Sequence, residues 1–210
     1  MPNFIADMPD STAKQRVLFS FKETSKLKFT LVKSFLDSDF EVIIAGKFGK
    51  QLTDEAIFKN FSKKPIFFDC DFIKEAAVKE LQNDLFKNHY PLDIVVTDLS
   101  QPALKNNYKQ NSFEKLRGQI EIELMSYFHL LKCVIPLMNS THSQLYHLVN
   151  KVDFEGGKGL GNRVLTDIAS SSIIKMMEDE IEDSKINLNE LNVSLLWDSI
   201  LTDQFVKESK

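Results

Sequence analysis

The run Leu92-Asp93-Ile94-Val95-Val96, followed by Thr97-Asp98, is nearly continuous in apolar residues instead of alternating with polar ones. A strand with this pattern is covered on both faces, as in a parallel sheet that carries helices on both sides. Similar short apolar runs occur before and after it. They predict further strands at residues 17–21, 40–45, 65–69, 144–149 and 192–197.

Longer segments with apolar residues at helical spacing separate these runs. They predict helices at residues 27–36, 53–61, 74–87, 112–138 and 162–182. Regular alternation of strand and helix favours right-handed βαβ crossovers. The sequence therefore predicts an α/β fold: a doubly wound, Rossmann-like parallel sheet of about six strands with helices on both faces. We expect a polar N-terminal segment over residues 1–15 and a single domain over residues 16–210.

Composition narrows the classes of function. The 210 residues carry a formal net charge of −4, with a pI near 5.6, which argues against bulk attraction to nucleic acid or to an anionic membrane. No apolar run reaches the roughly 18 residues needed to span a bilayer, and the N-terminus has no stretch of secretory type. A cytoplasmic location is expected. Cys70 and Cys133 predict two buried free thiols, not a disulfide framework or a metal pair.

Glycine is scarce for a nucleotide-binding α/β chain, at 7 residues against 17 phenylalanines. Such folds use glycine in phosphate-binding turns because only glycine lets backbone N–H groups approach a pyrophosphate closely. The count argues against an ordinary phosphate loop.

The order and spacing of the predicted elements resemble the short-chain dehydrogenase/reductase family from about Arg16 to Phe205. The resemblance also rests on four framing segments: EVIIAGK at 41–47, DCD at 69–71, LDIVVTD at 92–98 and LLKCVIPLM at 130–138. It implies a Rossmann fold, a nicotinamide cofactor and an active site with a Tyr-x-x-x-Lys pair.

The phosphate-binding turn departs from the pattern that the family implies. Its Thr-Gly-x-x-x-Gly-x-Gly segment matches residues 21–28, where Lys22, Lys26 and Lys28 stand in place of the three glycines. Side chains there fill space and penalise positive φ angles. The lysines predict a solvated loop, although their ammonium groups could also bind another anion.

The catalytic positions depart as well. Those that match the family's Asn, Ser, Tyr and Lys are Glu123, Asn150, Arg163 and Asp167. The guanidinium of Arg163 cannot act as an acid near neutral pH, and Asp167 would raise the pKa of a neighbouring acid. No Tyr-x-x-x-Lys occurs anywhere in the chain. No catalytic residue is predicted.

Other groupings carry little chemistry. Arg163 and Asp167 have the spacing of an ordinary helical ion pair. The separation of His142 and His147 is not that of a helical metal pair, so no metal is expected. In the family, the helices that match 112–138 and 162–182 pair with their copies. The resemblance therefore implies a homodimer or hetero-oligomer through these two helices.

These observations favour a dehydrogenase-like protein without oxidoreductase activity and without a cofactor, acting as a binding or assembly subunit. The alternative is a divergent NAD(P)-dependent oxidoreductase, using NADP, in which Lys22, Lys26 and Lys47 hold the phosphates. A third hypothesis is an anion or nucleotide sensor that performs no chemistry.

Overall fold

The computed structural model describes residues 14–22, 26–47, 63–99, 112–138, 143–149, 161–180 and 186–192. Its strands are β1 (Arg16–Phe21), β2 (Glu41–Gly46), β3 (Ile66–Asp69), β4 (Ile94–Asp98), β5 (Gln144–Val149) and β6 (Asn187–Asn192). Its helices are α1 (Lys26–Asp37), α2 (Glu75–Asn88), α3 (Phe113–Val134), which continues as the 3-10 turn η2 (Ile135–Leu137), and α4 (Gly161–Glu180).

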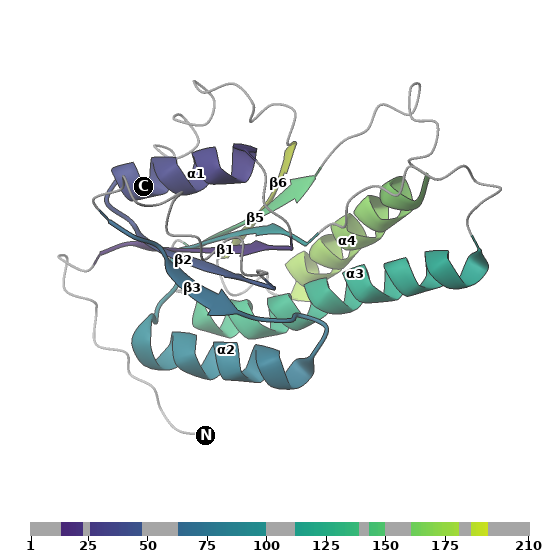
Figure 1. The fold of residues 1–210 in the computed structure, drawn as a ribbon, viewed down its shortest axis with the longest axis horizontal. Helices are drawn as coiled ribbons and strands as arrows, with labels where there is room; N and C mark the ends of the chain where they lie inside the picture. Colours follow the sequence, from purple (N-terminus) through teal and green to yellow (C-terminus); the bar gives the residue numbers. More distant parts are fainter. Residues whose placement is uncertain are drawn as a thin grey trace.

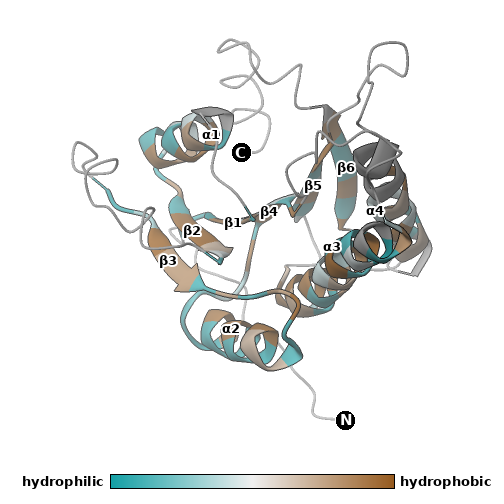
Figure 2. Cartoon of the chain, turned by 45° about the vertical axis from the view of Figure 1, so that its right-hand side comes forward, coloured by the Kyte–Doolittle hydropathy of each residue, from teal (hydrophilic) through white to brown (hydrophobic). Residues whose placement is uncertain are grey.

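All six strands are parallel, in the order β3-β2-β1-β4-β5-β6. Helix α1 covers one face of the sheet, while α2, α3 and α4 cover the other (Figures 1 and 2). The predicted doubly wound, Rossmann-like fold is confirmed. None of the described helices is both long and apolar enough to cross a membrane.

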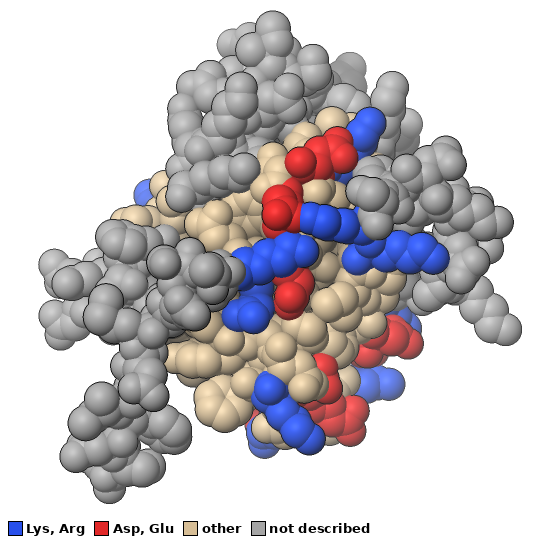
Figure 3. Space-filling model, turned by 90° about the vertical axis from the view of Figure 1, so that its left-hand side faces the viewer, with Lys and Arg blue, Asp and Glu red and all other residues tan. Residues whose placement is uncertain are grey.

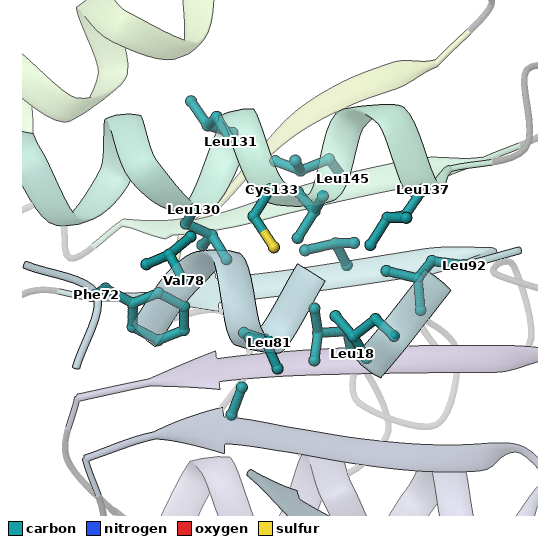
Figure 4. Packing of buried hydrophobic residues seen from close by; sticks show 14 of the residues in the cluster. Leu18, Phe72, Val78, Leu81, Leu92, Leu130, Leu131, Cys133, Leu137 and Leu145 are labelled. Carbon is teal, nitrogen blue, oxygen red and sulfur yellow. The ribbon is translucent and has the colours of Figure 1, made fainter. Parts of the chain in front are cut away.

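Two apolar clusters hold the layers together because side chains of consecutive strand residues point to opposite faces. On the α1 face, Phe19 and Phe40 pack edge-on against Phe35 of α1, with ring centroids 5.5 and 5.0 Å apart. On the other face, Leu18 of β1 and Leu145 of β5 belong to a cluster with residues of α2 and α3 (Figure 4). Strands buried on both faces explain the continuous apolar runs.

Charged side chains form ion pairs and hydrogen bonds at the edge of the sheet where the parallel strands begin. Arg16 contacts Glu41 at 3.3 Å, and Glu41 also lies 2.7 Å from Nδ1 of His89. The backbone N–H of Arg16 donates to Asp93, linking β1 to the chain just before β4. Figure 3 looks onto this side of the molecule and shows basic and acidic side chains interleaved across it. These contacts join elements that are distant in sequence.

Three predicted boundaries were wrong. The last strand was expected at 192–197, but β6 begins at Asn187 and its described side chains are half-buried or exposed. An edge strand is covered less than a central one, so its sequence, NLNELN, lacks a continuous apolar run. Strand β4 is displaced by two residues from the predicted 92–96. Helix α3 ends at Val134 because Pro136 has no N–H for the carbonyl of Lys132.

Some expected features lie outside the described residues. These are the helix at 53–61, the glycine-containing segment at 156–160, residues 193–197 of the last predicted strand and His142.

Candidate functional site

The sheet has its topological switch point between β1 and β4, since the chain winds toward β3 on one side and toward β6 on the other. In open α/β sheets, ligands bind in the crevice outside the carboxyl ends of the strands at this point. The candidate site is therefore built from residues at the ends of β1 and β4.

A buried ion pair stands in that crevice. Lys28 extends from the first turn of α1, and its Nζ lies 2.9 Å from Oδ2 of Asp98, the last residue of β4. The two side chains are only 9% and 11% exposed. The ammonium also lies 5.0 Å from the ring centroid of Phe21, the last residue of β1. Lys28 thus connects α1 to the ends of both strands.

A cavity of about 210 Å³ lies on the other side of Phe21, facing α3; we call it the strand-end pocket. It is lined by residues that follow four strands and by α3, among them Lys22, Lys47, Asp71, Phe72, Leu99 and Ile122. Lys47 Nζ lies 3.5 Å from the carboxylate of Asp71, and Lys74 Nζ lies 3.8 Å from it. The pocket combines apolar walls with an excess of positive charge.

Three buried polar residues lie in a row across β1, β4 and β5, beside the pocket. Ser20, Thr97 and His147 stand side by side on adjacent strands, on the face that α3 covers. The ring of His147 packs edge-on against Tyr127 of α3, with centroids 4.7 Å apart. The hydroxyl of Tyr127 accepts the backbone N–H of Leu99 at 3.1 Å. Tyr127 thereby ties α3 to the end of β4.

Burial sets the protonation state of His147. Removal from water lowers its pKa to about 4, although Asp98 and Glu190 raise it by their charge. The ring is 2% exposed and Tyr127 is 1% exposed. Near neutral pH this histidine is a neutral core residue, inaccessible to a substrate.

The lysines predicted from the phosphate turn have different surroundings. Lys28 is buried and ion-paired, so the expectation of a solvated loop is wrong for it. Lys22 is half-buried, and its backbone N–H donates to the carbonyl of Asp98. Lys26 begins α1, but its side chain is outside the described part, while Lys47 is 72% exposed at the rim of the pocket. The structure brings Lys22 and Lys47 to one pocket.

Only one of the four catalytic positions can be described in full. Glu123 is 2% exposed, and its Oε1 lies 3.4 Å from the amide of Gln119, one turn earlier on α3. Arg163 and Asp167 belong to α4, but their side chains are not among those that the structure describes. Asn150 lies outside the described residues. Among the described residues, no group of three or more His, Cys, Asp or Glu is placed to hold a metal ion.

Sequence reasoning missed Asp98 as the partner of Lys28, and Tyr127 as a bridge between α3 and β4. A carboxylate that ends a fully buried strand was the available signal for Asp98, since buried charges require partners. Nothing in the sequence pattern marked Tyr127, because its role depends on the packing of α3.

No protein-family model matches the sequence, and no curated protein sequence matches it. Solved structures do match. An enoyl-[acyl-carrier-protein] reductase (NADH) from Aquifex aeolicus is 18% identical at a TM-score of 0.72, with 85% of this chain and 80% of that chain covered. The fold is that of the short-chain dehydrogenases/reductases. ElxO with NADP bound is 17% identical at a TM-score of 0.74 over 86% of this chain and 73% of that chain.

A short-chain dehydrogenase from Streptomyces avermitilis is 13% identical at a TM-score of 0.71 and aligns with 86% of this chain. The alignment covers 66% of that longer chain, just under two thirds of its length. At these identities the likeness to short-chain dehydrogenases/reductases establishes the fold alone.

This fold implies a dinucleotide whose pyrophosphate lies at the switch point, next to the start of α1. The third glycine of the dinucleotide fingerprint lets the helix pack closely on the strand. Here Lys28 places a long side chain between α1 and the sheet, and its ammonium reaches Asp98. The ion pair therefore lies at the switch point, at the position where the third glycine of the fingerprint carries no side chain. This part of the site does not fit a dinucleotide.

Proposed function

We propose that this chain is a short-chain-dehydrogenase-like protein without oxidoreductase activity that acts as a binding or assembly subunit. The observation that carries the proposal is the buried Lys28–Asp98 ion pair in the crevice between β1 and β4. Separating the pair to admit a cofactor would leave the buried Asp98 carboxylate without its counter-charge and close to an anionic pyrophosphate, a change that costs several kcal/mol. Binding of a dinucleotide at this position therefore requires the loss of a contact that stabilises the fold.

The chemistry of the neighbouring side chains supports the same proposal. A carbonyl reductase needs a proton donor that a substrate can reach. His147 and Tyr127, the described titratable residues of the polar group beside β4 and β5, are sealed in the core. Their burial suits a structural role.

The assembly role rests on apolar side chains exposed on α3 and α4. Phe113, Met125, Phe128, Ile168 and Met176 are between 38% and 76% exposed. Adaptable methionines and aromatic rings are enriched at protein interfaces. We propose a homodimer or hetero-oligomer through the segments 112–138 and 162–182, in a cytoplasmic protein.

The loss of activity is tested with NADH and NADPH. Each is titrated into the purified protein while cofactor fluorescence and the midpoint of thermal unfolding are followed. Neither is expected to bind at concentrations up to the millimolar range, and no absorbance change at the nicotinamide band is expected with a panel of ketones and enoyl thioesters. Saturable micromolar binding together with hydride transfer would overturn the proposal.

The assembly role is tested by light scattering after size exclusion. A homodimer has twice the 24.1 kDa mass of the chain. Phe128→Glu on α3 and Ile168→Glu on α4 are expected to give monomers that unfold as the parent does. Phe86→Glu is the matched control, because Phe86 is 55% exposed on α2, outside the proposed interface. A parent protein that remains a monomer, alone and with cell extract, would contradict the assembly role.

The second candidate function is a divergent NAD(P)-dependent oxidoreductase. It is favoured by the strand-end pocket, whose Lys22 and Lys47 are suited to phosphate, and by solved structures of the same fold. These include ElxO with NADP bound and a 3-ketoacyl-(acyl-carrier-protein) reductase from Brucella melitensis complexed with NADH. This function requires NADPH to bind with the Lys28–Asp98 pair displaced, and the titration above separates it from the first.

A further inference from the structure

The three buried polar residues that lie in a row across the central strands form a feature of the core distinct from the strand-end pocket. Ser20 of β1 is in register with Thr97 of β4, and Thr97 is in register with His147 of β5. Ser20 and Thr97 are 0% exposed, and His147 is 2% exposed. We call these three residues the polar row. None of them lines the pocket.

Protein groups do not satisfy the hydrogen-bonding capacity of the polar row. Within the part of the chain that the structure describes, Ser20 Oγ, Thr97 Oγ1 and both ring nitrogens of His147 have no hydrogen-bond partner. The Thr97 carbonyl is one of the groups that oppose the lowering of the His147 pKa by burial, but neither ring nitrogen meets hydrogen-bond geometry with it. About nine in ten buried polar groups in proteins are hydrogen-bonded to protein or to ordered water. Four unpaired atoms on three adjacent residues therefore require a partner that is not a protein group.

The spacing of the strands fits a water molecule between neighbouring members of the row. Adjacent strands lie about 4.8 Å apart, and side chains in register leave the sheet on the same face. A direct hydrogen bond between two oxygen atoms needs about 2.8 Å, whereas two such bonds that meet at one water molecule span about 4.5 Å. The polar row is therefore spaced for water-mediated contacts and not for direct ones.

The chemistry of the row also favours water over an ion. Each hydroxyl donates and accepts hydrogen bonds, and a neutral imidazole donates from one nitrogen and accepts at the other. Water does both, so it can satisfy the row whichever ring nitrogen of His147 carries the proton. Burial lowers the pKa of His147 to about 4, so the row carries no charge near neutral pH that could compensate a buried ion. Polar sites with two to four partners hold internal water, whereas apolar cavities stay dry.

We infer that the polar row is a binding site for internal water, with one molecule between Ser20 and Thr97 and a second between Thr97 and His147. The two molecules connect β1, β4 and β5 beneath α3 through hydrogen bonds additional to those of the sheet. This role goes beyond the proposed function and does not depend on it, because it concerns the core and not the crevice.

Oxygen-17 relaxation dispersion of the full chain tests this inference, because it counts water molecules that stay inside a protein for longer than the protein takes to tumble. The parent protein is compared with Thr97→Val, which keeps the shape of the side chain and removes the hydroxyl, and with Ser20→Ala. Thr97→Val is expected to lose two internal water molecules and Ser20→Ala one. Val95→Thr is the matched control. It lies on the same strand and face, its neighbours in register are Leu18 and Leu145, and its water count should equal that of the parent.

Urea unfolding gives an independent test through the sign of the change. If water satisfies the row, Thr97→Val breaks hydrogen bonds and lowers the midpoint by about 0.5 M. If the hydroxyl has no partner, the same change removes an unsatisfied buried group and raises the midpoint. Val95→Thr buries a hydroxyl among apolar neighbours and should lower the midpoint, which calibrates the cost of an unsatisfied group in this strand.

Two results overturn the inference. One is an equal number of internal water molecules in the parent and in Thr97→Val, and the other is a higher urea midpoint for Thr97→Val. If Thr97→Val does not fold, an unchanged water count in Ser20→Ala overturns the inference in its place. Each of these results leaves the proposal of a protein without oxidoreductase activity standing, because that proposal is tested by the titrations with NADH and NADPH.

Discussion

The ammonium of Lys28 lies 2.9 Å from the carboxylate of Asp98, with both side chains about nine-tenths buried at the switch point of the sheet. The pair joins the first turn of α1 to the end of β4. An ion pair so far from water is weakly screened, yet its formation also requires the desolvation of two charges. Each of the two buried charges therefore requires the other as its counter-charge. The pair lies at the position where this fold otherwise binds ligands.

Breaking this pair from one side is expected to be costly. Asp98→Asn leaves the Lys28 ammonium buried without its counter-charge and should lower the free energy of unfolding by about 3 kcal/mol. The double variant Lys28→Met with Asp98→Leu should recover most of the loss, because no charge is then buried. Urea unfolding measures both. Arg117→Gln, which breaks the exposed Arg117–Glu121 pair on α3, is the control and should leave the midpoint unchanged. A loss below about 1 kcal/mol for Asp98→Asn would indicate a solvated pair.

His147 is expected to make the protein sensitive to acid. Its pKa is lowered to about 4 in the fold by burial, whereas the ordinary value is 6.5. Between these values the unfolded chain binds a proton that the native protein does not, so acid favours unfolding. The free energy of unfolding is therefore unaffected by this histidine above about pH 6.5. It falls as the pH is lowered from about 6.5 toward 4, by about 3 kcal/mol in all.

The test compares the parent protein with His147→Leu by urea unfolding at pH 7.5 and pH 5.0. The parent should lose about 2 kcal/mol more than the variant over this interval. Burial raises the pKa of Asp93, which acts in the opposite direction, so the difference between the two proteins isolates the histidine. An equal loss in both would show that His147 is accessible to protons in the folded state.

Gln82 is expected to stabilise the end of α3. Pro136 cannot donate to the carbonyl of Lys132, and the side-chain amide of Gln82 on α2 donates to the carbonyls of Lys132 and Cys133 at 3.4 and 3.2 Å. Gln82→Ala should lower the free energy of unfolding by about 1 kcal/mol. Asn83→Ala, at an exposed position on the same helix, is the control. Because Ala has the highest helix propensity, neither change should lose stability through the helix itself, and an unchanged or higher free energy of unfolding for Gln82→Ala would contradict the role of Gln82.

The two cysteines are expected to be inert in the folded protein. Both are free and buried, and burial raises the pKa of Cys70 and of Cys133 to about 12. Reaction requires the thiolate, so a thiol reagent such as DTNB at pH 8 should label neither residue. Both should react in urea. Rapid labelling of one cysteine in the native protein would reveal a local opening around β3 or α3.

Much of the fold followed from local sequence patterns. The runs of apolar residues in β1, β2 and β5 predicted these strands to within a residue at each end, because a strand buried on both faces admits few polar residues. Helical periodicity did the same for α1 and α2. The start of the edge strand β6 was placed five residues too late, at Asn192 instead of Asn187, since its sequence carries no such run.

For the candidate site, too, the sequence predicted some features and the tertiary structure decided others. The sequence by itself determined that three lysines replace the glycines of a phosphate turn and that no Tyr-x-x-x-Lys is present, because these are facts of residue identity. Only the tertiary structure decided what the lysines do: Lys28 pairs with Asp98, 70 positions away, while Lys22 and Lys47 meet at one pocket. The physical reason is that a parallel sheet gathers the ends of distant strands at one edge, and neither charge pairing nor burial there can be deduced from local spacing.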